Sequence, residues 1–347
     1  MYKALIDRLE ADSFLTADEY LTLIENYKQI SDYAAQRAVE TKKKYYGNKV
    51  FVRGLIEFSN YCRNNCYYCG IRAGNKNIER YRLTPDEIVS CADSGYELGF
   101  RTFVLQGGED THYTDDDFEF VIKEIKRRHP DCAVTLSLGE RSTDSLKRLK
   151  DAGADRYLLR HETANREHYG KLHPDSMSFD NRLRCIDDLK RFGYQVGVGF
   201  MVGSPYQTDR DLANEFAFLK KVNPQMVGIG PFITHKDTPF CDFKSGSAEK
   251  TLFMLSLIRL TLPRVLLPAT TALGTLDAKG REKGILAGAN VLMPNLSPVS
   301  VRGKYMLYDN KICTGEEAAQ CVECLKNRIK TTGHEIVTDR GDYKNEV

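Results

Sequence analysis

Short apolar runs alternate with amphipathic stretches along most of this chain, and this alternation restricts the folds open to it. The stretches between the runs, such as TPDEIVSCADSGYELG and DNRLRCIDDLKRFG, have apolar residues at helical spacing and often end in glycine, as helices do. Runs that predict strands lie at 50–58, 102–106, 133–138, 156–161, 196–202, 226–232, 265–271 and 290–294. Strand-then-helix units of this number, over roughly 250 residues, predict an α/β fold, the TIM-type (β/α)8 barrel.

The alternative architecture is a doubly wound open sheet. Such a sheet places a glycine-rich phosphate turn after its first strand, whereas the run at 50–58 is followed by cysteines. In a barrel, chemistry takes place at the carboxyl ends of the strands, so we expect reactive residues just after each apolar run.

Three regions are expected along the chain. Residues 1–47 form an N-terminal helical segment, in which Thr16 and Glu19 resemble a capping box that begins a helix. Residues 48–310 form the barrel, and residues 311–347 form a C-terminal extension that contains cysteines. No linker rich in proline, glycine or serine follows the helical segment.

Charge and hydropathy exclude several classes of partner. The formal net charge is +2, from 50 basic and 48 acidic residues, which argues against nucleic acid or an anionic membrane. No window reaches 18 consecutive apolar residues, and the N-terminus lacks the apolar core of a secretory signal. We therefore expect a cytoplasmic protein. In that compartment, cysteine clusters with ligand spacing indicate metal sites before disulfides.

A cluster of three cysteines, Cys62, Cys66 and Cys69, follows the first predicted strand with the spacing C-x3-C-x2-C. These thiolates can hold a cubic 4Fe–4S cluster, and they satisfy three of its four irons. The fourth iron stays open for another ligand. A structural zinc site is the alternative, but it needs a fourth protein ligand, and the nearest histidine, His112, belongs to another loop.

The motif, with an aromatic residue just before its third cysteine, resembles the radical S-adenosylmethionine (SAM) superfamily. The resemblance implies that the open iron chelates SAM, and that one electron from the cluster releases a 5′-deoxyadenosyl radical. Other strand ends carry the same resemblance. Gln106, Gly107, Gly108 and Glu109 are similar to a glycine-rich loop that contacts SAM, and VGFMVG at 198–203 is similar to its adenine-side segment.

A set of strings from Gly54 to Cys324 further resembles the HydE family of FeFe hydrogenase maturases. They are VLQGGED, TLSLGE, YLLRHETAN, DNRLRC, MVGIGPFITHKDTP, LPATTALGT and ANVLMPN. The resemblance implies that Gln106, Glu162 and Arg182 contact SAM, the arginine through the carboxylate, which its planar fork suits.

The same resemblance implies the substrate and the partners. The substrate would be a small iron carbonyl–cyanide unit that carries cysteine, on the way to the di-iron centre of the hydrogenase. Its cavity would be lined by Thr135, Arg160, Thr270, Thr271 and Tyr305. The implied partners are the sister hydrogenase maturases and a flavodoxin or ferredoxin that donates electrons.

Each of these side chains also has an ordinary structural explanation. Arg160 and Glu162 can form a salt bridge at the barrel rim, and Arg182 can face solvent early in its helix. The two consecutive threonines can be plain strand residues, and Tyr305 can lie at the edge of the core. The residues alone leave these alternatives open.

A second cysteine cluster, Cys313, Cys321 and Cys324, has the spacing C-x7-C-x2-C. It resembles an accessory site for a 2Fe–2S or second 4Fe–4S cluster that some members of the HydE family carry. Zinc and a vestigial, empty site are the alternatives. We expect an accessory role and not a catalytic one.

Other functions compete with this interpretation. A sulfur-inserting enzyme of the biotin synthase type would need strand cysteines inside the barrel, whereas Cys132 opens its strand at the opposite end. A mutase that resembles methylornithine synthase shares the motifs and does not need the second cysteine cluster. A non-catalytic iron–sulfur carrier is disfavoured because simple electron carriers usually have four cysteine ligands.

Overall fold

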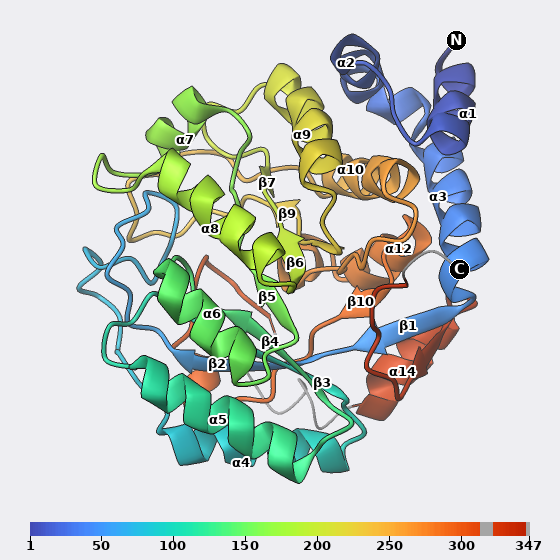
Figure 1. Ribbon diagram of the computed structural model, residues 1–347. Helices are drawn as coiled ribbons and strands as arrows, with labels where there is room; N and C mark the ends of the chain where they lie inside the picture. Colours follow the sequence, from blue (N-terminus) through green and yellow to red (C-terminus); the bar gives the residue numbers. More distant parts are fainter. Residues whose placement is uncertain (313–321, 345–347) are drawn as a thin grey trace.

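The computed structural model describes residues 1–312 and 322–344. Its strands are β1 (Lys49–Val52), β2 (Gly54–Ser59), β3 (Thr102–Gly107), β4 (Ala133–Ser137), β5 (Arg156–Leu158), β6 (Gln195–Val198), β7 (Met201–Val202), β8 (Met226–Val227), β9 (Gly230–Pro231), β10 (Val291–Leu292) and β11 (Glu335–Val337). Its helices are α1 (Tyr2–Asp12), α2 (Ala17–Glu25), the 3-10 helix η1 (Tyr27–Gln29), α3 (Ser31–Tyr46), α4 (Pro85–Glu97), α5 (Asp115–Arg128), α6 (Thr143–Asp151), α7 (Arg166–Leu172), α8 (Phe179–Arg191), α9 (Asp209–Val222), α10 (Ala248–Thr261), α11 (Thr271–Leu276), α12 (Gly280–Leu286), α13 (Val299–Arg302) and α14 (Val322–Lys330). Figure 1 shows α4, α5, α6 and α8 on the outside of the strands.

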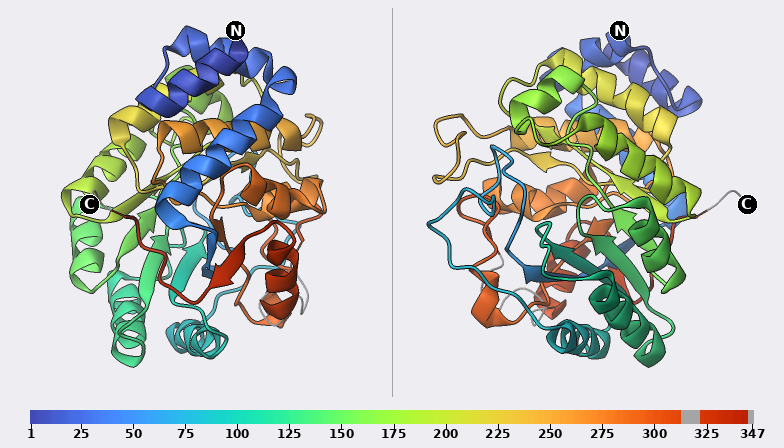
Figure 2. Two further views of the ribbon diagram at one scale, coloured as in Figure 1. Left: turned by 90° about the vertical axis from the view of Figure 1, so that its right-hand side faces the viewer. Right: turned by 60° about the vertical axis from the view of Figure 1, so that its left-hand side comes forward.

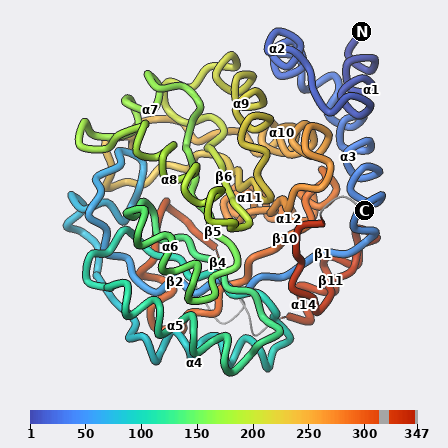
Figure 3. Tube along the Cα trace, in the orientation of Figure 1, coloured from blue at the N-terminus to red at the C-terminus, as the bar shows by residue number. Residues whose placement is uncertain are grey.

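The strands close into a parallel barrel. A continuous ladder runs in the order β2-β3-β4-β5-β6-β8, with Gly54 opposite Phe103 at its start. Isolated parallel bridges continue the ladder around the barrel, joining Met226 to Leu266, Pro268 to Val291, and Leu55 to Asn295. The last bridge returns to β2, so the ring is complete (Figure 3) and the predicted (β/α)8 barrel is confirmed.

Many of the helices begin where a side chain binds their first amides, as at the start of α4. Thr84 accepts a hydrogen bond from the amide of Glu87, and the carboxylate of Glu87 accepts one from the amide of Thr84. The same reciprocal box begins α2, α5 and α9. Each cap contributes about 1 kcal/mol by pairing amides that the helix leaves free. The predicted box of Thr16 and Glu19 is confirmed.

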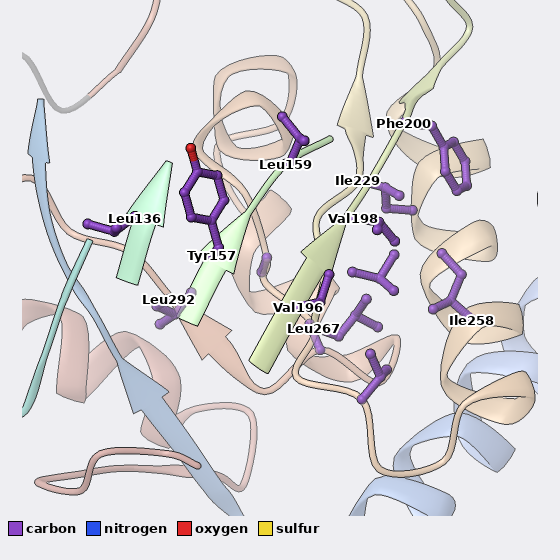
Figure 4. Close-up of a cluster of buried hydrophobic side chains, with 14 of the residues drawn as sticks. Leu136, Tyr157, Leu159, Val196, Val198, Phe200, Ile229, Ile258, Leu267 and Leu292 are labelled. Atoms are coloured by element: carbon purple, nitrogen blue, oxygen red, sulfur yellow. The ribbon is translucent and has the colours of Figure 1, made fainter. Parts of the chain in front are cut away.

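The main core lies between the barrel and its ring of helices. Tyr157, Val196 and Val198 point outward from their strands and are buried. Figure 4 shows these side chains beside the strands, with Ile258 of α10 facing the two valines. Each such apolar side chain stabilises the fold by roughly 1.5–3 kcal/mol. The intervening strand residues, such as Leu158, line the interior of the barrel, where a cavity remains.

The N-terminal helices cover one side of the barrel (Figure 2). The ring of Tyr20 in α2 stacks on Phe216 of α9 with centroids 4.0 Å apart. Its hydroxyl shares a 2.8 Å hydrogen bond with Thr261 at the end of α10. Within residues 1–312 and 322–344, no helix has both the length and the apolar character needed to cross a membrane.

The C-terminal segment closes the amino-terminal end of the barrel. Strand β11 pairs in parallel with β1, and residues 338–344, which we call the C-terminal strap, then pass beneath the strands (Figure 2). Asp342 of the strap lies 2.6 Å from the fully buried guanidinium of Arg156. The carbonyl of Arg340 accepts hydrogen bonds from Thr102 at 2.8 Å and from Arg156 at 2.9 Å.

The seventh predicted strand is the main difference from expectation. The run at 265–271 makes only isolated bridges, because Pro268 has no amide to donate and Thr270 already caps α11. The runs at 196–202 and 226–232 each divide into two short strands, and β7 pairs with β9 as a separate ribbon.

Candidate active site

The loop that carries the first three cysteines, residues 60–75, follows β2 and has no helix or strand of its own. Arg80 gives it shape by donating hydrogen bonds to the carbonyls of Ile71 at 2.8 Å, Arg72 at 2.7 Å and Asn75 at 3.1 Å. Sequence reasoning missed Arg80, because a single arginine beyond the motif carries no pattern.

Neighbouring elements clamp this loop from outside. The amide of Tyr67 donates to the carbonyl of Leu172 in α7 at 3.0 Å. On the other side, Gly108 lies so close that an added Cβ would stand 2.1 Å from the carbonyl oxygen of Tyr61 and 2.7 Å from Cβ of Cys62. The predicted glycine-rich loop therefore packs directly against the cysteine loop, and glycine is required at that contact.

The three thiols are half-buried and free. Burial raises the pKa of Cys62 and Cys66, and it raises the pKa of Cys69 to about 12. Thiols in such surroundings stay protonated until a bound metal displaces the proton. The sulfur of Cys66 also lies 3.6 Å from the thioether sulfur of Met177, so the α7–α8 connection covers the loop.

The donor set fits a cluster better than a single ion. In the part of the chain that the structure describes, no three His, Cys, Asp or Glu side chains converge on one metal-ion position. A zinc ion needs all its ligand atoms about 2.0–2.3 Å from one centre. A cubic cluster instead takes each thiolate on a different iron and so holds the sulfurs apart. The residues present therefore fit an iron–sulfur cluster.

A cavity of about 210 Å³ lies inside the barrel, below the cysteine loop. Its walls are inward-facing residues from successive strands, including Leu55, Val104, Leu158 and Met226. Cys69 and its neighbour Tyr68 lie at its upper end, together with residues of the loops after the strands. The cavity is thus reached from the same end of the barrel as the cysteines.

The structure brings several predicted residues together at this cavity. Its lining includes Gln106, Thr135, Arg160, Thr270 and Thr271. Tyr305 is fully buried and is not among the residues that line the cavity, whereas Tyr308 is.

Arg160 and Glu162 approach each other at the end of β5. Their closest atoms, Nη2 and Oε2, are 3.2 Å apart, but neither atom has a partner with hydrogen-bond geometry. Nε of Arg160 and Oγ1 of Thr135 are likewise buried without partners among the described residues. Each such group costs about 1–3 kcal/mol unless a ligand satisfies it. Glu162 also has a backbone φ of 68°, a left-handed conformation that costs a non-glycine residue about 1–3 kcal/mol.

Arg182 is buried in α8, outside the cavity lining. Its guanidinium donates to Glu140 at 2.6 Å and to the carbonyl of Arg160 at 2.7 Å. Burial by itself lowers the pKa of this group, but Tyr169 and Glu140 more than compensate and raise it. Arg182 is therefore a fixed cation, joined to the end of β5 through the Arg160 carbonyl.

Glu109 points away from the cavity into a separate surface cleft. Its carboxylate pairs with Arg63 at 3.0 Å and accepts the amide of Glu140 at 2.9 Å. Gly107, one position before Gly108, packs against Phe58. These contacts make the turn after β3 rigid.

Charged residues that sequence reasoning did not single out also line the cavity. Arg53 and Glu57 face inward from the first strand of the barrel, and Lys311 enters from the beginning of the C-terminal extension. Arg53 contacts the thioether of Met226 at 3.0 Å, and its Nε and Nη2 have no partner in the described residues. Period-two spacing from Leu55 could have predicted the inward direction of the two strand residues.

Comparisons with known proteins agree with this arrangement. The model of the "Radical SAM superfamily" matches residues 56–219. The [FeFe] hydrogenase maturase subunit HydE of Thermotoga maritima is 45% identical over 99% of this chain and 97% of its own. The 3-methylornithine synthase of Methanosarcina barkeri is 30% identical over 87% of this chain and 83% of its own.

Solved structures give the same fold. A crystal structure of methylornithine synthase (PylB) superposes with a TM-score of 0.83 at 26% identity, covering 96% of this chain and 97% of that one. The maturase HydG superposes with a TM-score of 0.80 at 21% identity, over 97% of this chain and 76% of that one. The cysteine motif, the barrel and the full-length similarity agree, and the chain belongs to the radical SAM enzymes and, among them, to the family of the hydrogenase maturase HydE.

Proposed function

We propose that this enzyme uses a SAM-derived radical to convert a small iron carbonyl–cyanide unit that carries cysteine, during assembly of the di-iron centre of FeFe hydrogenase. The observation that supports it most is the cavity of about 210 Å³ under the cysteine loop, into which two arginines, Arg53 and Arg160, bring nitrogen atoms without partners among the described residues. Guanidinium N–H groups that lack hydrogen-bond acceptors favour an anionic ligand. The 45% identical HydE subunit supports the role in maturation.

The cysteine loop would hold the cofactor. Cys62, Cys66 and Cys69 each provide one thiolate, and the loop backbone is held by Arg80. When bound, a 4Fe–4S cluster supplies the electron that cleaves SAM into methionine and a 5′-deoxyadenosyl radical. Around it, we assign SAM contacts to the turn and strand-end residues Gln106, Gly107, Gly108, Glu109, Glu162 and Arg182. For Glu109 the contact would come from the backbone, since its carboxylate is already bound by Arg63.

The substrate would lie deeper in the barrel. We assign its contacts to Thr135, Arg160, Thr270, Thr271 and, at one remove, Tyr305. The hydroxyl of Thr135 and two nitrogen atoms of Arg160 have no partner among the described residues. They can donate hydrogen bonds to an anionic unit, the hydroxyl as a neutral group and the guanidinium as a cation. Aliphatic walls exclude water from the same space, which protects a reactive radical from side reactions.

The first test is SAM cleavage by the reconstituted, reduced protein. We expect 5′-deoxyadenosine and methionine to appear in equal amounts. Cys66→Ala should abolish both products, because the cluster loses a ligand. Cys91→Ala is the matched control, since this buried cysteine lies in α4, outside the cysteine loop. Cleavage that survives in the Cys66 variant would exclude the ligand assignment.

The second test is hydrogenase maturation. Co-expression with the sister maturases and an FeFe hydrogenase should yield active hydrogenase only with the intact protein. If the hydrogenase becomes active when Cys66→Ala is the only form of this protein in the cell, the maturase function is excluded, even if SAM cleavage has been shown.

A rearrangement of the methylornithine synthase type is the second candidate, supported by the 30% identical relative and the TM-score of 0.83. Incubation with SAM and a mixture of the common amino acids distinguishes it, because only this function would produce 3-methylornithine. Sulfur insertion has less support, since Cys69 is the only cysteine that lines the cavity among the described residues.

An accessory cluster at Cys313, Cys321 and Cys324 remains part of the proposal. Cys313 and Cys321 lie outside the described residues. Cys324 stands near the beginning of α14. Iron and sulfide analysis of a Cys324→Ala variant tests this site. We further propose a flavodoxin or ferredoxin as the electron donor, which a reduction assay with each purified carrier would identify.

A further inference from the structure

A buried ion pair occupies the cavity wall formed by β2, which lies three strands along the ladder from β5, the strand that precedes Arg160. The Lys311 ammonium lies 2.6 Å from Oε1 of Glu57. The two side chains are 6% and 1% exposed, so solvent does not screen the pair. Both residues line the cavity, whereas their sequence positions are 254 residues apart.

Neighbouring groups fix the orientation of this pair. The second carboxylate oxygen of Glu57 accepts the side-chain amide of Asn295 at 2.7 Å. The Lys311 ammonium donates a second hydrogen bond to the carbonyl of Tyr305 at 2.8 Å and lies 4.9 Å from the centre of that ring. An ammonium group has three N–H donors. Two of them are used, and the third has no acceptor among the described residues.

Stability alone does not explain such a pair. Removing two charges from water costs several kcal/mol per ion, and apolar residues of similar volume are often as stable or more stable. The cavity that this pair lines also has apolar residues in its wall, among them Leu55, Val104 and Leu307. The charged pair instead presents adjacent positive and negative groups to the interior of the cavity.

Adjacent opposite charges on one wall are complementary to an amino acid in its zwitterionic form. We propose that Lys311 binds the carboxylate of an amino-acid group inside the cavity through its free N–H, and that Glu57 binds the ammonium of the same group. The inference rests on the proposed function in that the substrate carries cysteine. It adds a ligand subsite on the β2 wall, supplied in part by the C-terminal extension.

The test measures binding of two small probes to the reconstituted, oxidised holoenzyme saturated with SAM, by isothermal titration. S-methyl-L-cysteine carries both charged groups, and 2-(methylthio)ethylamine lacks the carboxylate. Lys311→Met should weaken binding of S-methyl-L-cysteine about 10- to 100-fold, because one charge-assisted hydrogen bond is lost, and it should not weaken binding of the amine, which has no carboxylate. Lys304→Met is the control, since Lys304 pairs with Glu79 at the surface, and both probes should bind it normally.

A second variant keeps the inference testable if Lys311→Met does not fold. Glu57→Gln preserves the shape of the side chain and removes its charge. It should weaken the binding of both probes, because both carry the ammonium group. Equal binding of S-methyl-L-cysteine to wild type and Lys311→Met overturns the assignment, and so does equal binding of both probes to wild type and Glu57→Gln. If the probes bind as expected but hydrogenase matures without the enzyme, the subsite stands and the proposed function fails.

Discussion

Replacing Glu215 by alanine should destabilise the cavity wall at the end of β5. Glu215 and His161 are completely buried, and Nε2 of His161 lies 2.7 Å from Oε2 of the carboxylate. The other carboxylate oxygen accepts the amide of Ala164 at 2.8 Å. Nδ1 of His161 accepts the amide of Gly199 at 3.2 Å, so the ring is neutral and its proton is on Nε2.

The magnitude follows from the donors left behind. Glu215→Ala leaves the His161 N–H and the Ala164 amide buried without acceptors, at about 1–3 kcal/mol each. The free energy of unfolding should therefore fall by about 2–6 kcal/mol. Glu215→Gln keeps one carbonyl acceptor and should lose about half as much. These hydrogen bonds hold the chain on both sides of Glu162, whose backbone φ is 68°. We therefore expect the SAM concentration that gives half-maximal activity to rise in both variants, because Glu162 is less well positioned.

The assay is urea unfolding of the purified variants, followed by circular dichroism, together with SAM titration of 5′-deoxyadenosine formation. Glu167→Ala is the control. Glu167 is exposed on α7 and pairs with Lys171 at 3.0 Å, so its loss should cost less than about 0.5 kcal/mol. A loss below about 1 kcal/mol for Glu215→Ala would refute the reasoning, because two buried donors could not then be unsatisfied.

Three further predictions concern other parts of the barrel. Gly108→Ala should lower iron and sulfide content, because the methyl group would stand 2.1 Å from the Tyr61 carbonyl oxygen. Asp342→Asn should lower unfolding free energy by about 1–2 kcal/mol, since buried Arg156 loses its half-exposed counter-ion. Burial lowers the pKa of Lys42 from 10.5 to about 7, so Lys42→Met should stabilise the fold by roughly 2–5 kcal/mol at pH 7 and progressively less toward pH 10.5. A pH-independent gain would contradict this.

The fold could be read from the chain wherever local pattern and final structure agree. Apolar runs and glycine-ended helices predicted the barrel, and the box at Thr16 and Glu19 predicted the start of α2. The run at 265–271 has the apolar pattern of a strand, and its residues do lie in the barrel wall. It makes only isolated bridges because Pro268 prevents regular pairing there.

The site residues could be predicted where they form a motif of closely spaced residues. The cysteine motif follows β2, and Gly107 and Gly108 lie at the end of β3, as expected. Contacts between distant positions gave no such signal. Glu57 and Lys311 meet across 254 residues, and Arg80 binds carbonyl groups, which every residue has. Such partners depend on the closed barrel and not on any local pattern.

The C-terminal strap has a consequence for how the protein is made. Strand β1, near the start of the chain, pairs with β10 and β11, and buried Arg156 receives Asp342 from the last few residues. The strands of the ring, which the Leu55–Asn295 bridge completes, are therefore synthesised before residue 342, and until then buried Arg156 lacks its Asp342 partner. We expect chains that stop before residue 338 to be more protease-sensitive than chains that include the C-terminal strap.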